Sequence, residues 1–312
     1  MMSQSLKGRD FISIHDFTCE ELQLIFDTTK MLKIEERMGI RRHILKDKNL
    51  AMIFQKSSTR TRVSFEIGMN QMGGKALFLS NNDIQLNRGE TIGDTASVLC
   101  RYVDGIMARV FKHQDILDLA KFSSVPVING LSDFLHPCQA VADFYTMLEK
   151  RGFLKGLRLV YIGDSNNVSN SLMMASAKTG VHMTICSPRG YEPNKEIMAW
   201  YNQDAPVTGS TFKLTSDPVE AVRDADFIYT DVWASMGQEK EAEERKAIFA
   251  PYQVNSQLMS KAPNHAMVLH CLPAHRGEEI TDEVVDSVQS VVFDEAENRL
   301  HAQKAIMALL MA

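Results

Sequence analysis

Residues 50–69 read LAMIFQKSSTRTRVSFEIGM and contain the clearest structural signal in the chain. The apolar run 50–54 predicts a buried strand, and 63–69 predicts a helix. Hydroxyl and guanidinium groups crowd the turn between them, at 58–62. The first N–H groups of the helix and the positive end of its dipole point to the same turn. The stretch therefore predicts a phosphate site, with a capped helix and solvated arginines as the open alternative.

The rest of the chain alternates between strand and helix patterns. Thr18 and Glu21 form a capping box before an opening amphipathic helix. Further helices are expected at 59–72, 91–102, 115–122, 137–150 and 295–311, and strands at 75–79, 105–110, 125–128, 157–162, 181–186, 227–230 and 267–270. This alternation predicts an α/β protein with two domains, each a parallel sheet covered by helices, joined by interdomain helices.

Length, charge and cysteine content narrow the class of protein. The chain of 312 residues is long enough for two domains, and its net charge of −5 argues against a general nucleic-acid binder. We find neither an apolar run of membrane-spanning length nor a secretory signal, so no membrane partner is expected. The five cysteines are scattered without metal-site spacing, which favours a cytoplasmic, reducing setting.

Chemically unusual residues follow the predicted strands in both halves. They are Ser58-Thr59-Arg60-Thr61, Arg109, His136-Pro137-Cys138-Gln139, Gly163-Asp164-Ser165-Asn166-Asn167, Asp231 and Cys271-Leu272-Pro273. Ligands of open parallel sheets bind beyond the carboxyl ends of the strands, so these residues predict a ligand edge in each half. The turn after Gly163 lacks the later glycines of a dinucleotide site, and no P-loop is present. A small phosphate is therefore favoured over a nucleotide.

These motifs together resemble the aspartate and ornithine carbamoyltransferases. The carbamoyl-phosphate site of that family is similar to SSTRTR at 57–62, ARV at 108–110 and HPCQ at 136–139. Its ornithine-specific members are similar in GDSNN at 163–167, DVWASMG at 231–237, HCLP at 270–273 and EAENR at 295–299. The likeness covers nearly the whole chain in the same order.

The resemblance implies transfer of a carbamoyl group from carbamoyl phosphate to the δ-amine of L-ornithine, giving citrulline and phosphate, without metal or organic cofactor. It implies a homotrimer or a multiple of trimers. It also implies a carbamoyl-phosphate domain at 1–147, with the C-terminal helix 294–312 packed back on it, and an ornithine domain at 148–293. By matching position, carbamoyl phosphate would be held by Ser58, Thr59, Arg60, Thr61, Gln85, Arg109, His136, Gln139, Cys271, Leu272 and Arg299, and ornithine by Asn167, Asp231, Ser235 and Met236.

Carbamoyl phosphate carries a dianion beside a reactive carbonyl, and the residues suit both parts. Arg60 and Arg109 are expected to neutralise the phosphate oxygens. Thr61, Arg109 and His136 are the candidate donors to the charge that develops on the carbonyl oxygen. Gln139 is expected to accept from the carbamoyl amide. For His136 the alternative is a helix-start histidine bonded to backbone.

The attacking group is an amine with a lysine-like pKa of about 10.4, which must lose a proton first. We expect Asp231 to orient the amino acid and Cys271 to tune its δ-amine, the alternative for Cys271 being an inert buried thiol. An acid at Asp231 suits a diamino acid, whereas an aspartate-specific enzyme would present cations there. Cys138 is close enough to the predicted site to be modified, and Arg62 is expected to be structural.

Three questions stay open at the level of the sequence. The charged run 239–246 after Gly237 is typical either of a loop that closes over ornithine or of a solvated helix face. Putrescine or an N-acylated ornithine could replace ornithine as acceptor, and a non-catalytic binding protein on the same scaffold is the alternative from another class. The direction of flux, in a urea cycle, arginine biosynthesis or the arginine deiminase pathway, is also undecided.

Overall fold

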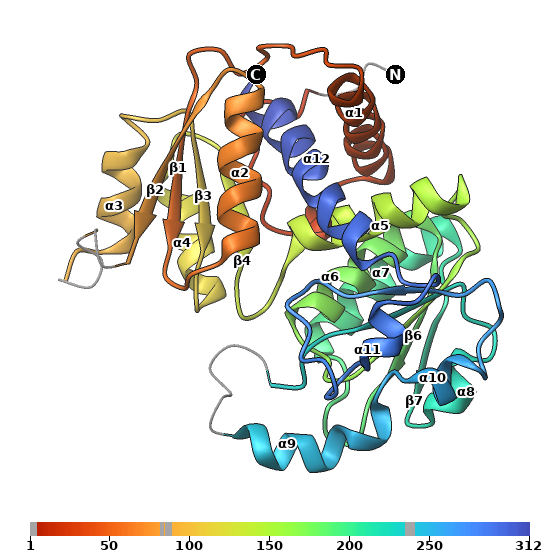
Figure 1. The fold of residues 1–312 in the computed structure, drawn as a ribbon. Helices are drawn as coiled ribbons and strands as arrows, with labels where there is room; N and C mark the ends of the chain where they lie inside the picture. Colours follow the sequence, from red (N-terminus) through yellow and green to blue (C-terminus); the bar gives the residue numbers. More distant parts are fainter. Residues whose placement is uncertain (1–4, 82–83, 85–88, 235–240) are drawn as a thin grey trace. The chain divides into compact units, whose positions relative to one another are not determined.

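The structure, a computed structural model, describes residues 5–81, 84, 89–234 and 241–312. The chain divides into two compact units, one made of Met1–Tyr145 and Asn298–Ala312 and the other of Thr146–Glu297. Two helices, α5 (Pro137–Arg151) and α12 (Val292–Met311), each begin in one unit and end in the other (Figure 1).

The first unit is built on a four-stranded parallel sheet of order β2-β1-β3-β4. Its strands are β1 (Asn49–Phe54), β2 (Lys75–Ser80), β3 (Gly105–Arg109) and β4 (Val127–Leu131). Helices α3 (Ile92–Leu99) and α4 (His113–Phe122) cover one face, where they bury Ala96, Ile116 and Leu119 against the sheet. Figure 1 shows α2 (Thr59–Gln71) and α12 on the opposite face, with α1 (Cys19–Arg37) beside α12.

Helix α2 packs very closely against α12. A Cβ atom on Gly68 would lie 3.0 Å from Cε of Met307 and 3.2 Å from Cγ of Lys304. Even a Cβ at this position would require the side chains of Met307 and Lys304 to shift, so the glycine permits the close approach of the two helices. Helix α1 is attached to the same helix, because Lys33 donates a 2.6 Å hydrogen bond to Asn298.

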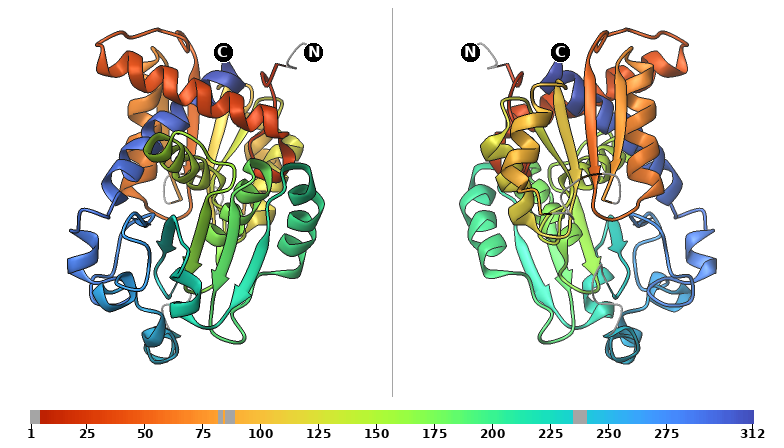
Figure 2. Two further views of the ribbon diagram at one scale, coloured as in Figure 1. Left: turned by 90° about the vertical axis from the view of Figure 1, so that its right-hand side faces the viewer. Right: turned by 90° about the vertical axis from the view of Figure 1, so that its left-hand side faces the viewer.

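The second unit has a five-stranded parallel sheet of order β7-β6-β5-β8-β9. Its strands are β5 (Arg158–Ile162), β6 (His182–Cys186), β7 (Phe212–Thr215), β8 (Phe227–Thr230) and β9 (Met267–Leu269). Helices α6 (Asn167–Thr179) and α7 (Lys195–Thr208) lie on one face, and α8 (Pro218–Val222), α10 (Ser256–Met259) and α11 (Asp282–Val285) on the other (Figure 2). The unit also contains α9 (Ala242–Phe249), and short 3₁₀ helices occur at Ile14–Asp16 and Ala250–Tyr252.

The expected α/β fold with parallel sheets is confirmed, and so is the capping box of Thr18 and Glu21. Three details of the expectation were wrong. Strand β4 runs from 127 to 131 rather than 125 to 128, the helix expected at 91–102 ends at Leu99, and β7 was not anticipated. The sequence pattern of β7 is weak because this strand is a partly exposed edge strand of only four residues. Among the described residues, no helix combines the length and apolarity needed to cross a membrane.

Candidate active site

The predicted phosphate turn is the N-terminus of α2. Ser58 is the N-cap: its hydroxyl accepts from the N–H of Thr61 over 3.3 Å and donates to the Thr61 hydroxyl over 3.1 Å. Arg299 of α12 donates to the same Thr61 oxygen over 3.0 Å. The turn is therefore both a capped helix and a place where a guanidinium group from the far end of the chain arrives. Thr59 is the exposed first residue of this helix.

Three guanidinium groups act on His136, which is almost fully buried. Burial lowers the pKa of His136 well below its ordinary value, and the positive charges of Arg299, Arg109 and Arg60 lower it further. Arg109 ends β3 and Arg60 lies in the first turn of α2, so three separate elements supply the charge. His136 is thus neutral at neutral pH and can donate one N–H. A dianion would find concentrated positive charge here.

Gln139 and Cys138 lie in the first turn of α5 and make different contacts. The amide nitrogen of Gln139 donates to Asp143 over 2.7 Å, which orients the side chain with its oxygen as the accepting end. Cys138 is fully buried, donates to the carbonyl of Asn129 over 3.3 Å, and has a pKa raised to about 12 by burial. The expectation that Cys138 could be modified is therefore wrong, since neither access nor thiolate character supports it.

Arg62 lies outside this group. It pairs with Glu66 over 3.4 Å on the exposed side of α2, and its guanidinium carbon lies 3.9 Å from the ring centre of Phe78. These contacts agree with the structural role expected for it. Three further predicted residues, Gln85, Ser235 and Met236, fall outside the described residues.

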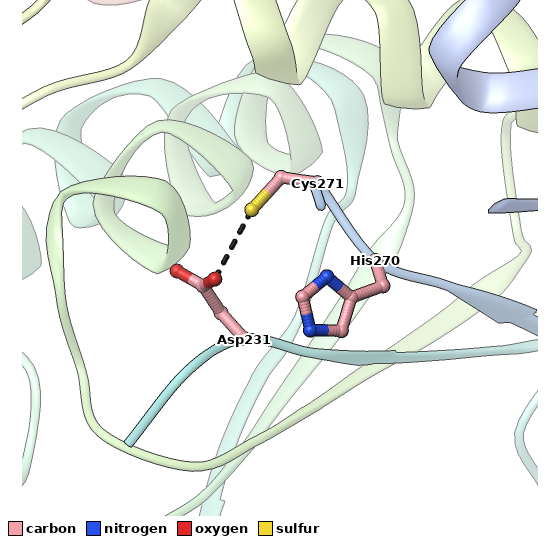
Figure 3. A group of neighbouring side chains, drawn as sticks. All are labelled: Asp231, His270 and Cys271. Carbon is pink, nitrogen blue, oxygen red and sulfur yellow. Dashed lines mark hydrogen bonds between the residues drawn. The ribbon is translucent and has the colours of Figure 1, made fainter. Parts of the chain in front are cut away.

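The second unit presents Asp231 at the carboxyl end of β8, largely buried. Figure 3 shows the thiol of Cys271 directed at this carboxylate, to which it donates over 3.1 Å. Asn166 donates to the other carboxylate oxygen over 2.7 Å, and the N–H of Val232 donates over 2.8 Å. Donors from the ends of three strands thus fix one acid, with both oxygens accepting.

The loop after β9 is held by buried side chains. Leu272 has a positive φ of 56°, and its N–H donates to Nδ1 of His270 over 2.9 Å. The ring hydrogen of His270 therefore lies on Nε2, which contacts Glu279 over 3.0 Å. Glu295 of α12 accepts from the backbone N–H of His270 over 2.8 Å. These buried acids set the path of the loop that carries Cys271 and Leu272.

Asp231, His270 and Cys271 also offer potential metal-ligand atoms within 4.8 Å of one another (Figure 3). A metal-binding histidine needs one unprotonated ring nitrogen for the ion. In His270 the unprotonated nitrogen already accepts from the backbone of Leu272. The arrangement therefore suits a hydrogen-bonded support for the loop better than a metal centre.

Sequence reasoning assigned no role to Asn166, yet the structure gives it two. Its side-chain oxygen caps α6 by accepting from the N–H groups of Val168 and Ser169, while its nitrogen donates to Asp231. An asparagine just before a predicted helix and just after a predicted strand was the available signal. Asn167, which was expected to bind ornithine, is the first residue of α6.

Comparison with known proteins gives full-length matches. The family model described as "Aspartate/ornithine carbamoyltransferase, carbamoyl-P binding domain" matches residues 9–149, and the "Asp/Orn binding domain" model matches 155–310. An ornithine carbamoyltransferase of Thermococcus kodakarensis is 60% identical over 99% of this chain and 98% of its own, and one of Pyrococcus furiosus, named as anabolic, is 59% identical over the same shares. The solved ornithine carbamoyltransferase of Pyrococcus furiosus superposes with a TM-score of 0.96 and is 58% identical over 99% of both chains. The solved enzyme of Gloeobacter violaceus superposes with a TM-score of 0.88 and is 42% identical over 98% of this chain and 99% of its own.

Proposed function

The chain belongs to the aspartate/ornithine carbamoyltransferase family, and from this membership we propose that it transfers the carbamoyl group of carbamoyl phosphate to the δ-amine of L-ornithine. The products are L-citrulline and phosphate. The bond that forms joins the amine nitrogen to the carbonyl carbon, and the bond that breaks joins this carbon to the phosphate oxygen. The amine loses a proton, and the departing phosphate is a chemically sufficient acceptor for it.

We assign carbamoyl phosphate to the first unit. Arg60, Arg109 and Arg299 lie close enough to His136 to depress its pKa, so their charges converge on one place. Charge-assisted bonds from guanidinium groups to phosphate oxygens are strong and directional. Neutral His136 and the hydroxyl of Thr61 are the donors to the carbonyl oxygen, and Gln139 accepts from the carbamoyl NH₂.

The observation that carries the choice of ornithine is the buried Asp231. Asn166, Cys271 and the backbone of Val232 each donate a hydrogen bond to its carboxylate and so fix the position of the acid. An anion at the carboxyl end of β8 attracts an ammonium group and repels a second carboxylate. An α-amino acid with a terminal amine fits this site, and aspartate does not.

The decisive test is citrulline formation from carbamoyl phosphate and ornithine, measured colorimetrically beside putrescine and N-acetylornithine as acceptors. Ornithine is expected to be the preferred acceptor. Arg60→Ala is expected to lower turnover by about 10²–10³, while Arg62→Ala, two residues away on the exposed side of α2, leaves it unchanged. Absence of citrulline with the unmodified protein would overturn the proposal, and preference for another acceptor would correct the substrate.

The assembly and the metabolic direction are parts of the same proposal. We infer a homotrimer, which exposed apolar side chains of the first unit support, among them Leu77, Tyr102 and Phe111. Light scattering is expected to give three times the 35.1 kDa of one chain, or a multiple of that mass. We assign the biosynthetic direction by analogy with the anabolic relative of Pyrococcus furiosus. Citrulline synthesis is then expected to be much faster than phosphorolysis of citrulline.

A further inference from the structure

A buried arginine without an assigned role lies in the second unit. Arg245, in the middle of α9, is 5% exposed. Its Nη1 donates to Oδ2 of Asp164 over 2.8 Å and to the carbonyl of Trp233 over 2.9 Å, and its Nε lies 3.3 Å from Glu241. The guanidinium carbon is 5.1 Å from the ring centre of Tyr191 and 5.9 Å from that of Phe249. A planar guanidinium group thus bridges several distinct partners at once.

Two of these partners belong to the segments that build the substrate end of the unit. Asp164 lies in the turn after β5, two residues before Asn166. Trp233 lies two residues after Asp231, beyond the end of β8. Asn166 and Asp231 are themselves joined by the 2.7 Å hydrogen bond. Arg245 therefore ties together, from a third element, the same two segments whose side chains meet at the carboxylate.

The charges favour the ion pair between Arg245 and Asp164. Burial raises the pKa of Asp164, and Arg245 opposes the shift by its charge and its hydrogen bond, while the nearby Asp231 and Glu241 raise it further. Without Arg245, the buried Asp164 would lose its cation while still close to Asp231. Removal of one partner of a buried ion pair is costly because the other is left uncompensated.

We propose that Arg245 is a positioning residue for the amine-bearing substrate: by binding Asp164 and the Trp233 carbonyl, it holds Asn166 and Asp231 in the geometry that receives the ammonium group. The inference rests on the proposed function for its kinetic part. Its structural part, which concerns how firmly the segments of Asn166 and Asp231 are held, does not depend on the proposed function.

The kinetic experiment compares Arg245→Gln and Arg245→Lys with Arg158→Gln. Arg158 is a matched control, since it is half-exposed and pairs with Asp224 at the opposite end of the same sheet. Arg245→Gln is expected to raise the ornithine KM about tenfold or more and to change the carbamoyl-phosphate KM by less than about twofold. Arg245→Lys keeps the positive charge but not the planar set of guanidinium N–H donors. Its ornithine KM is expected to lie between those of the unmodified protein and Arg245→Gln. Equal changes in both KM values would overturn the proposal.

A mutant cycle with Asp164 tests whether the two residues act as one unit. Asp164→Asn is expected to raise the ornithine KM in the same direction, and the double variant Arg245→Gln/Asp164→Asn to be no worse than the more impaired single variant. Fully additive effects would show that the two side chains act separately, and would overturn the proposal that Arg245 acts through Asp164.

Hydrogen exchange gives a readout that does not require turnover. The N–H groups of Val168 and Ser169 bond to Asn166, and that of Val232 bonds to Asp231. These amides are expected to exchange about tenfold faster in Arg245→Gln, but not in Arg158→Gln. Unchanged exchange, or uniform acceleration throughout the unit, would overturn the inference. If the unmodified protein made no citrulline, the proposed function would fail while exchange still decided the role of Arg245.

Discussion

The thiol of Cys271 donates to Oδ1 of Asp231 over 3.1 Å, joining the end of β9 to the end of β8. The sulfur and the acid therefore share one hydrogen at the place where we propose that the attacking amine binds. An approaching ammonium group would meet both atoms. The hydrogen bond between Cys271 and Asp231 is therefore the first contact to test by mutation.

Replacement of Cys271 by alanine removes a donor to Asp231. We expect the ornithine KM to rise about tenfold, and the pH profile of turnover to shift, because a hydrogen bond to a charged group is worth about 1.5–3 kcal/mol. Cys271→Ser keeps a donor and is expected to be less impaired. Steady-state kinetics across pH would measure both effects, with Cys100→Ser, at the residue that follows α3, as the control. An unchanged ornithine KM and pH profile in Cys271→Ala would exclude this role.

Arg299 is expected to matter for turnover although it is remote in sequence from the phosphate turn. Arg299→Gln removes the donor to Thr61 and one of three positive charges near His136. Turnover is expected to fall by about 10²–10³, with a higher carbamoyl-phosphate KM and little change in the ornithine KM. Single-turnover kinetics would test this, and a selective effect on ornithine would place Arg299 in the wrong half of the reaction.

The buried, neutral His136 makes stability depend on pH in one direction. Its pKa in the folded state lies well below the ordinary 6.5. Between the two values the unfolded chain binds a proton that the folded chain does not. The free energy of unfolding is therefore highest above about pH 6.5 and falls below it by up to about 1.4 kcal/mol per pH unit from this group.

Denaturant unfolding between pH 5 and 8 would measure that slope. His136→Gln is expected to flatten it on the acid side, whereas His182→Gln, at the first residue of β6 in the second unit, is not. The same acid-side slope in the His136 variant and the unmodified protein would mean that another group is responsible.

The close approach of α2 to α12 predicts a stability effect. Gly68→Leu places a branched side chain where a Cβ alone would be 3.0 Å from Met307. We expect the free energy of unfolding to fall by about 1–3 kcal/mol. Ile67→Ala, on the exposed side of the same helix, is expected to change it by less than about 0.5 kcal/mol. Thermal or urea unfolding would distinguish them; an unaffected Gly68 variant would mean that α12 moves away at little cost.

Chelation is expected to leave turnover unchanged, since the ring nitrogens of His270 are occupied by Leu272 and Glu279. Citrulline formation after dialysis against EDTA would measure this. Loss of turnover that returns on addition of zinc would show instead that His270 changes partners to bind the ion.

The sequence predicts most of the fold, because strand and helix periods alternate clearly and the unusual residues follow strands. It predicts Arg60, Arg109 and His136 as a group through their placement after strands of one sheet, whereas Arg299, inside α12, was expected only from the family resemblance. The pKa of His136 was beyond reach, since it depends on burial and on charges from three elements. Arg245 was also beyond reach: in a run of charged residues it is typical of a solvated face, yet its carboxylate partner Asp164 lies 81 residues earlier.

Residues 298–312 belong to the first unit although they follow the whole second unit in the chain. During synthesis, Arg299 leaves the ribosome 238 residues after Thr61, to which it donates. The first unit therefore lacks its part of α12 and the guanidinium group of Arg299 until the whole second unit has been synthesised. A chain interrupted before α12 lacks one of the three guanidinium groups that act on His136, so synthesis beyond residue 299 is required to assemble the site to which we assign carbamoyl phosphate.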